Sequence, residues 1–319
     1  MAAMEGLSGS VLVVRDSVPV VQVSTGMADG ESGAACTLDT RFQIASVSKQ
    51  FTAAAVMLLV EDQDLALDVP IAEWLPDCAP RWRCLTLHRL LSHTSGLGQW
   101  HELSGFDITE PGSAGEFLER FGEVPLRTAP GTAWHYSSPG YLLAAQIIEE
   151  ASGRSYADFL TERVLRPLGL DSTSVGAPAS REAACGYRGG LRVDAAEFAA
   201  MPGAGDVWST VGDLARYTAA FHTNAVVTEG SRETMLAAHM PVAGGWGTVG
   251  PVAADGYGYG YCLGTLAGRR ACFHPGDNPG YQSFLGWLPE VDTTIAILAN
   301  DEETSIAGIL SRILPAVAE

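Results

Sequence analysis

Short valine-rich runs near the start of the chain give way to a longer apolar run. Residues 8–14 and 18–23 flank a short polar segment, a pattern that predicts two strands joined as a β-hairpin. Residues 50–60 carry no charge and predict a buried helix. The longest apolar stretch, residues 53–60, is far shorter than the ~20 residues that span a bilayer, so we expect no membrane segment.

The middle of the chain has the spacing of helices. From residue 67 to about 170 the pattern is helical and is interrupted by prolines. Residues 140–151 repeat leucine and isoleucine on one helix face, and residues 213–221 predict another helix.

The last third of the chain changes to strand-like runs. Strands are predicted at residues 257–263, 271–274, 281–288 and 293–298. Residues 303–314 then place isoleucine and leucine on one face and predict a closing helix. Strands at both ends around a helical middle predict an α/β (α+β) fold, with one sheet built from both termini and an inserted α-rich region.

Composition and charge limit the class of protein and the kinds of partner it can bind. The chain has 319 residues, of which 47% are hydrophobic and 18% charged, as in a compact globular protein. Its net charge is −18 and it has no basic cluster, which argues against nucleic acid as a partner. The first residues lack a basic n-region, so we expect a cytoplasmic protein. Six cysteines without a Cys-x-x-Cys motif predict reduced core residues, with a Cys78–Cys84 disulfide as the alternative.

The segment Ser46-Val47-Ser48-Lys49 opens the predicted buried helix. If that helix starts near Ala45, Ser46 and Lys49 lie on one face, with Cβ atoms ~5–6 Å apart. A serine needs an adjacent base to become a nucleophile, and an amine in an apolar setting loses its proton more easily. The alternative is a plain helix N-terminus with Ser46 or Ser48 as its cap.

Other catalytic templates are missing. The chain has neither a Gly-x-Ser-x-Gly elbow nor a His-Glu-x-x-His motif, and His88, His93 and His101 lack helical ligand spacing, so we expect no metal. A Gly-x-Gly-x-x-Gly run at 245–250 has no preceding strand, and Pro251 follows where a helix should continue. We interpret this run as a loop and not as a dinucleotide site.

Two later segments support the prediction that Ser46 is a nucleophile. Tyr136 lies in a turn that leads into the predicted helix at 140–151, a junction where functional side chains often lie. His274-Pro275-Gly276 ends a predicted strand, and a glycine there permits close approach of another backbone or of a ligand. The alternatives are a packed aromatic side chain for Tyr136 and a surface strand end for His274.

Further motifs follow one order along the chain. They are Gly9-Ser10-Val11-Leu12-Val13, Ser24-Thr25-Gly26-Met27-Ala28-Asp29, Phe42-Gln43-Ile44-Ala45 before Ser46, Leu90-Leu91-Ser92-His93-Thr94-Ser95-Gly96-Leu97, Tyr136-Ser137-Ser138, Gly205-Asp206-Val207-Trp208-Ser209-Thr210 and His274-Pro275-Gly276. With these motifs the chain resembles the serine beta-lactamase-like family of class C type. That family also includes D-alanyl-D-alanine carboxypeptidases, D-aminopeptidases, esterases and acyltransferases. The resemblance runs nearly end to end.

The resemblance implies a beta-lactamase/transpeptidase-like fold, with an antiparallel sheet flanked by helices and an α-rich region. We expect residues 1–319 to form a single catalytic domain. Its α/β part would comprise residues 1–65 and 185–319, and its mainly helical part residues 66–184.

The resemblance also implies roles. Ser46 would attack a carbonyl and form an acyl-enzyme, and Lys49 and Tyr136 would share the proton transfers, with the base unassigned. The oxyanion hole would be the backbone N–H groups of Ser46 and Asp277, each worth ~3–4 kcal/mol in acyl transfer. No metal or cofactor would be needed.

Substrate binding is where the chain departs from the family. Ser138 stands where the family has asparagine, and His274 stands where lactamases have lysine, which removes a cation for a substrate carboxylate. Both changes weaken the case for beta-lactam hydrolysis, unless they are tolerated variants that leave the substrate unchanged. Gly276 belongs to the same strand, and Trp134 and Trp100 are predicted walls of the site, although core packing explains these aromatics equally well.

We therefore expect a serine hydrolase that cleaves a small ester, amide or peptide, of esterase or D-amino acid peptidase type. The first alternative is an acyltransferase or peptide cyclase that uses the same acyl-enzyme. The second is a catalytically silent binding or assembly protein on this fold, against which the retained Ser46, Lys49 and Tyr136 argue. The oligomeric state is open.

Overall fold

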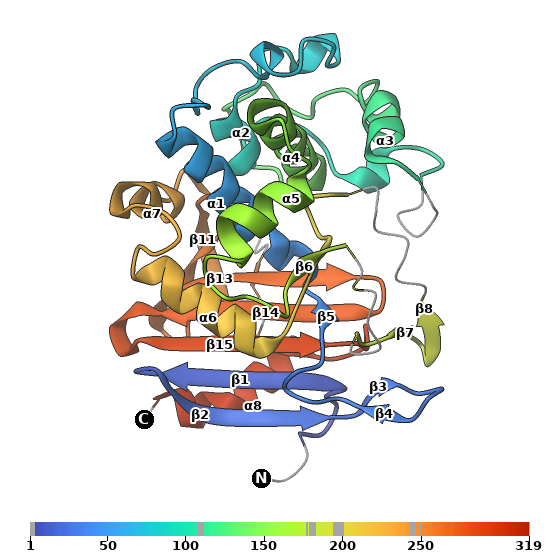
Figure 1. The fold of residues 1–319 in the computed structure, drawn as a ribbon, viewed down its shortest axis with the longest axis vertical. Helices are drawn as coiled ribbons and strands as arrows, with labels where there is room; N and C mark the ends of the chain where they lie inside the picture. The colour runs from blue at the N-terminus through green and yellow to red at the C-terminus, as the bar shows by residue number, and fades with distance from the viewer. Residues whose placement is uncertain are drawn as a thin grey trace.

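A computed structural model describes residues 4–106, 112–176, 178, 183–193, 201–242, 247–248 and 250–318. Its described residues build one eight-stranded antiparallel sheet from both ends of the chain (Figure 1). In spatial order the strands are β10 (Met240–Pro241), β11 (Val252–Tyr257), β12 (Cys262–Leu266), β13 (Arg269–Asn278), β14 (Tyr281–Leu288), β15 (Thr293–Ala299), β1 (Gly9–Arg15) and β2 (Val18–Thr25). The predicted sheet from both termini is thereby confirmed.

Strands β1 and β2 form the predicted hairpin. Its turn residues Asp16 and Ser17 both have positive φ, 47° and 64°, which suits the right-handed twist of the flanking strands. The next strand in the sheet comes from the far end of the chain, because β1 pairs with β15 from Gly9↔Ala299 to Arg15↔Thr293.

Alternation along these strands separates the core into two layers. Leu12 of β1 and Leu298 of β15 belong to the cluster shared with the helix α6 (Val211–His222), which packs on β1 and β15. Their neighbours Val11 and Ile297 belong to a second cluster, which includes α8 (Ile306–Ala318). Because successive side chains point to opposite faces of a strand, α6 and α8 cover opposite faces of the sheet.

The remaining helices lie above the sheet, as Figure 1 shows. They are α1 (Ser48–Glu61), α2 (Leu87–Leu91), α3 (Ala114–Phe121), α4 (Ser138–Ser152), α5 (Tyr156–Leu160) and α7 (Glu229–Met235). Short helical turns are η1 (Ala45–Val47), η2 (Ile71–Glu73), η3 (Pro80–Trp82), η4 (Trp100–Glu102), the π-turn η5 (Thr161–Leu165) and η7 (Pro289–Val291). Small sheets pair β3 (Met27–Asp29) with β4 (Ala34–Ala35), β9 (Val207–Ser209) with β5 (Phe42–Gln43) and β6 (Ser174–Val175), and β7 (Gly186–Arg188) with β8 (Leu191–Val193).

The helix α1 confirms the predicted buried helix, since its side chains from Ser48 to Leu59 are all buried. It packs against α4 and α5. The helix predicted at 140–151 is α4, which begins two residues earlier because the Ser137 side chain accepts a hydrogen bond from the Gly140 N–H and caps it. The division into an α/β part and a helical part stays a prediction.

One strand prediction was wrong. Residues 257–263 are not a single strand but the end of β11, a tight turn and the start of β12. The Gly258 N–H donates to the Tyr261 carbonyl, and Gly260 has φ +76°. A Cβ at Gly260 would come within 2.7 Å of the Lys49 carbonyl oxygen, so the glycines let this turn lie against α1. Its three alternating tyrosines are buried and resemble a strand in sequence.

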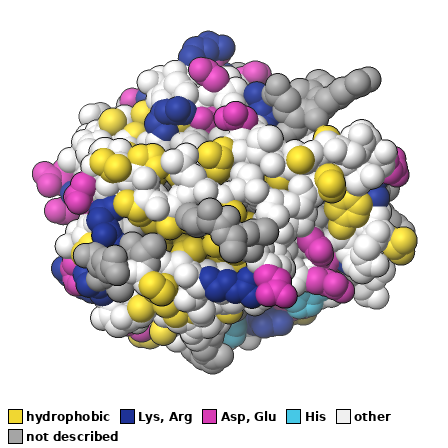
Figure 2. All heavy atoms as spheres, turned by 90° about the horizontal axis from the view of Figure 1, so that it is seen from below, with side chains coloured by type: hydrophobic (Ala, Val, Ile, Leu, Met, Phe, Trp, Pro, Cys, Tyr) yellow, Lys and Arg dark blue, Asp and Glu magenta, His cyan; other side chains and the backbone are white. Residues whose placement is uncertain are grey.

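The surface and the cysteines complete the description. On the face seen in Figure 2, hydrophobic side chains are scattered among both signs of charge. All six cysteines are free, so the alternative Cys78–Cys84 disulfide is absent. None of the helices in the described ranges is long and apolar enough to cross a membrane.

Candidate active site

The serine lies on a turn and not inside the helix. The helix α1 begins at Ser48, and Ser46 occupies the 3₁₀ turn η1 (Ala45–Val47) that leads directly into it, so the helical stretch starts at Ala45 as predicted and the regular α-helix starts three residues later. Ala45 has φ +47°, a left-handed conformation that costs a non-glycine residue ~1–2 kcal/mol. The turn is held from the sheet side, because Ser283 Oγ of β14 donates to the Ile44 carbonyl at 2.7 Å. Ser46 is therefore presented half-buried at the edge of a pocket.

Lys49 completes the predicted pair. Its Nζ lies 3.0 Å from Ser46 Oγ, 3.4 Å from Ser138 Oγ and 2.6 Å from the Ala204 carbonyl oxygen. The side chain is fully buried. Burial lowers the pKa of Lys49 to about 7, whereas the Asp206 carboxylate acts in the opposite direction. A large neutral fraction of this amine is thus available to accept the serine proton near neutral pH.

Asp206 is a member of the site whose role the sequence alone did not reveal. Its buried Oδ1 accepts the Gly203 N–H at 2.9 Å and so holds the turn whose Ala204 carbonyl binds Lys49. Burial raises the pKa of Asp206 to about 7, and the hydrogen bonds and the charge of Lys49 oppose that rise. The only signal was its place in the Gly205-Asp206-Val207-Trp208 motif.

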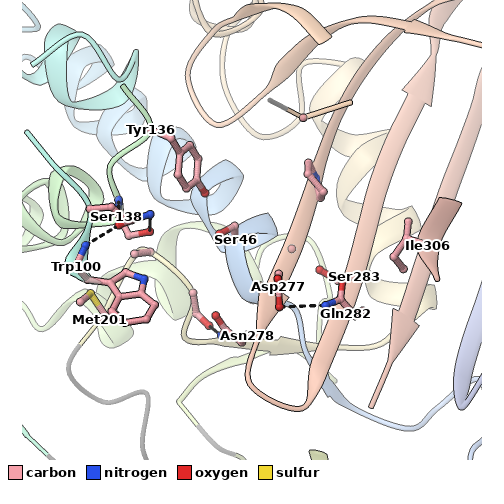
Figure 3. A pocket seen from close by; sticks show the side chains of 16 residues that line it. Ser46, Trp100, Tyr136, Ser138, Met201, Asp277, Asn278, Gln282, Ser283 and Ile306 are labelled. Atoms are coloured by element: carbon pink, nitrogen blue, oxygen red, sulfur yellow. Dashed lines mark hydrogen bonds between the residues drawn. The ribbon is translucent and has the colours of Figure 1, made fainter. Parts of the chain in front are cut away.

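Tyr136 lines the same pocket as Ser46 (Figure 3). Lys49 Nζ lies 5.0 Å from the centre of its ring. Burial raises the pKa of the Tyr136 hydroxyl well above its usual value, and a hydrogen bond with Ser46 acts in the opposite direction. The phenol therefore stays protonated near neutral pH and can serve as a proton donor.

The Leu90–Leu97 motif explains how Tyr136 is held. His93, buried and at φ +59°, accepts the Ser137 N–H at Nδ1 (3.1 Å) and the His135 N–H at its carbonyl (2.8 Å). Its ring centre lies 4.4 Å from that of Tyr136. His93 is thus a packing residue, as predicted, which clamps both sides of the tyrosine. His88 hydrogen-bonds to Tyr259, and His101 is exposed.

Ser138 contacts the pocket at the first turn of α4. Its N–H donates to Gln99 Oε1 at 3.1 Å, and Gln99 Nε2 donates to its Oγ at 3.3 Å. Gln99 therefore supplies an amide to the wall beside the position where the family has asparagine. Sequence reasoning missed Gln99, which directly precedes the predicted wall residue Trp100; the structure places both in the pocket.

Gly276 lets the strand β13 lie directly against η1 (Ala45–Val47), the turn that carries the predicted nucleophile Ser46 and is called the nucleophile turn below. A Cβ built at this residue would lie 2.1 Å from Ser283 Oγ and 2.6 Å from the Ile44 carbonyl oxygen. The close backbone approach expected from the sequence is therefore present. The next residue, Asp277, lines the pocket on the same strand (Figure 3). The assignment of its N–H to an oxyanion hole stays a prediction.

Replacing Gly276 with alanine tests this approach. We expect the added methyl group to displace the nucleophile turn from β13 and lower the free energy of unfolding by about 3 kcal/mol, as overpacking does. Urea unfolding of the purified variant measures the change. The control is Gly230→Ala on α7, where the new Cβ meets nothing within 4 Å. Equal stability of the two variants would contradict the close approach.

Two residues predicted to contact substrate do not line the pocket. His274 is fully buried; its Nδ1 donates to the Pro275 carbonyl at 2.6 Å and its Nε2 accepts from the Tyr257 hydroxyl at 3.0 Å. Burial lowers the pKa of His274 to about 3, so the ring is neutral. Trp134 is buried with its ring centre 6.0 Å from those of His93 and Tyr257. Both belong to the packing behind Tyr136, because strand and turn geometry directs them inward.

The pocket has a volume of about 390 Å³. Its described lining residues are Ser46, Gln99, Trp100, Tyr136, Ser138, Met201, Ala204, Gly205, Gly247, Pro275, Gly276, Asp277, Asn278, Gln282, Ser283 and Ile306. Gly247 belongs to the Gly-x-Gly-x-x-Gly run, of which residues 245–246 and 249 lie outside the described residues. The walls are thus mostly polar uncharged and apolar groups around Ser46, the predicted nucleophile.

Comparisons with known proteins agree with this geometry. A family model described as Beta-lactamase matches residues 1–313. Esterase EstB from Burkholderia gladioli is 36% identical over 51% of this chain and 46% of the esterase. Penicillin-binding protein 4 from Amycolatopsis lactamdurans is 31% identical over 92% of this chain and 80% of that protein. The structure of D-amino acid amidase from Ochrobactrum anthropi SV3 matches with a TM-score of 0.83 at 25% identity, over 97% of this chain and 94% of that chain.

These relatives carry names of the esterase, amidase and penicillin-binding type, so the expected fold and the expected class of serine hydrolases are confirmed. The match to the esterase spans less than half of that protein's length. The chain belongs to the Beta-lactamase family, as the order of its motifs predicted.

Proposed function

We propose that this protein is a serine hydrolase that forms an acyl-enzyme on Ser46 and cleaves an ester or amide. One observation carries the proposal: Ser46 Oγ lies 3.0 Å from the Nζ of a fully buried Lys49. A nucleophile and a base within hydrogen-bond reach, with the base held by further groups, are the arrangement that activates a serine.

In the proposed reaction the neutral Lys49 amine accepts the Ser46 proton as Oγ attacks the substrate carbonyl. A bond forms between Oγ and the acyl carbon, and the bond from that carbon to the departing oxygen or nitrogen breaks as the Tyr136 hydroxyl gives the departing atom a proton. The Lys49 ammonium then returns a proton to the Tyr136 oxygen. Water attacks the acyl carbon next, the Oγ–acyl bond breaks, and the acid and free Ser46 are released. Lys49 is assigned as the base because burial lowers its pKa to about 7 while the pKa of Tyr136 is raised. The N–H groups of Ser46 and Asp277 would bind the oxyanion.

The substrate class is proposed from the walls of the pocket. The neutral, buried His274 provides no cation for a substrate carboxylate, and Ser138 with Gln99 provides hydroxyl and amide groups instead. An ester or amide that carries no carboxylate therefore suits the site better than a beta-lactam. The names of the esterase and D-amino acid amidase relatives support this choice. The cytoplasmic location stays a prediction.

Covalent labelling tests the proposal directly. Wild-type protein treated with a fluorophosphonate is expected to gain the mass of one adduct, and peptide mapping is expected to locate it on Ser46. The alternative of a catalytically silent protein predicts no adduct. Product analysis with p-nitrophenyl butyrate and an added amine then separates hydrolysis from acyl transfer: an amide product that dominates over butyrate would contradict the hydrolase assignment.

A further inference from the structure

The charge of the pocket wall is unbalanced. Asp277 is the one charged residue among the described residues that line the pocket. Lys49, the basic side chain of the catalytic group, is buried, and its Nζ is already within hydrogen-bond distance of three protein oxygen atoms. A substrate that enters therefore meets a carboxylate and no cation on the described part of the wall.

The Asp277 carboxylate is exposed and positioned. Its Oδ1 accepts a hydrogen bond from Gln282 Nε2 of the adjacent strand at 3.0 Å, the contact drawn in Figure 3. Gln282 is uncharged, so this bond orients the carboxylate without neutralising it. Arg188, a cation on the strand β7, pairs with Glu302 at 2.6 Å, and the opposite charges of these two residues affect the Asp277 carboxylate in opposite directions. Within the described residues, Asp277 makes no ion pair and keeps its negative charge for an incoming group.

Asp277 places its negative charge on the pocket wall close to Ser46. It follows Gly276, which lies against the nucleophile turn, and Figure 3 shows its side chain near Ser46, with Trp100 and Ser138 on the other side of the pocket. An ammonium group on a substrate would pair with Asp277, whereas a carboxylate would be repelled by it. The net charge of −18 adds a long-range preference in the same direction.

From this arrangement we propose that Asp277 is a specificity-determining residue that selects substrates bearing a positively charged amine. The selection rests on the proposed function of the site but concerns the charge of the substrate and not the bond that is cleaved. A charge pair a few ångströms apart at the edge of a protein corresponds to about a tenfold preference over a neutral analogue.

Three ligands of one skeleton test the selection without turnover: 3-phenylpropylamine, 3-phenylpropanol and 3-phenylpropionate. By calorimetry, wild-type protein is expected to bind the amine about tenfold more tightly than the alcohol, and the carboxylate most weakly. In Asp277→Asn, which retains the backbone N–H and the shape, the amine should lose this advantage and the carboxylate should gain. Glu233→Gln removes one negative charge from an exposed position on α7 and should keep the wild-type order.

Kinetic measurements then show which part of the substrate carries the amine that Asp277 selects. The ratio of kcat/KM for a cationic to a neutral substrate is measured with D-phenylalanine p-nitroanilide against its N-acetyl form, and with butyrylcholine against butyl butyrate. A ratio that falls about tenfold in Asp277→Asn for the first pair assigns the amine to the acyl group, and for the second pair to the leaving group.

The failures are distinguishable. If wild type binds the amine no more tightly than the alcohol, or if Asp277→Asn keeps the preference, the selection by Asp277 is overturned, even where p-nitrophenyl butyrate is hydrolysed. If wild type cleaves no ester or amide but its preference for the amine is lost in Asp277→Asn, the hydrolase assignment fails and the charge selection stands.

Discussion

Replacing Ser46 with alanine is expected to lower kcat/KM for p-nitrophenyl butyrate by about 10⁴-fold or more, because the variant lacks the hydroxyl proposed to form the acyl-enzyme. Ser46 Oγ is the proposed nucleophile, and Lys49 Nζ lies 3.0 Å from it. The same variant should gain no mass with a fluorophosphonate. The free energy of unfolding should change by less than about 1 kcal/mol, since the side chain is small and half-buried.

The control for this prediction is Ser311→Ala, an exposed serine on α8 whose hydroxyl donates only to the Ala307 carbonyl one turn earlier. It should keep wild-type turnover and the wild-type adduct. An adduct that persists in Ser46→Ala, mapped to another serine, would show that the nucleophile is misassigned although the fold is right.

Replacing Lys49 with methionine is expected to lower kcat/KM by about 10³-fold, since the base is lost while a similar volume is retained. In the wild type, kcat/KM should fall as the pH drops below about 7. Burial lowers the pKa of Lys49 to that value, and only the unprotonated amine can accept the serine proton. The variant should lose this acidic limb. Rates measured from pH 5 to pH 9 give both results.

Asp206→Asn separates the charge of this carboxylate from the role of the base. The Asp206 charge raises the pKa of Lys49, so its removal should shift the acidic limb to lower pH without abolishing it. The asparagine side chain can still accept the Gly203 N–H that holds the turn at Ala204. An acidic limb that is unchanged in Lys49→Met would contradict the assignment of Lys49 as the base.

Much of the fold could be predicted from local pattern. The hairpin of β1 and β2, the helices α1 and α4 and the strands β14 and β15 follow from apolar runs whose spacing matches one element each. The prediction of a single strand over residues 257–263 was wrong, because three alternating tyrosines are equally compatible with a strand and with a turn that buries aromatic rings. Only the close approach of Gly260 to α1 distinguishes these possibilities, and this contact joins segments far apart in the chain.

In the site, too, local contacts could be predicted from the sequence and tertiary contacts could not. Ser46 and Lys49 were predictable because their contact is local: three residues along a helical turn bring the two side chains to one face. The contacts by which His93, Gln99 and Asp206 hold the site together could not be predicted. Each of these residues acts across a tertiary contact with a segment distant in sequence.

The sequence by itself determined that Ser46 and Lys49 lie side by side, the order of the family's motifs and the overall arrangement of strands and helices. Only the tertiary structure decided which neighbours face the substrate. His274 and Trp134 turned inward to pack behind Tyr136, while Gln99 and Asp277 line the pocket. The physical reason is that burial, and with it the pKa and charge of each group, depends on how distant segments pack together, which local spacing does not encode.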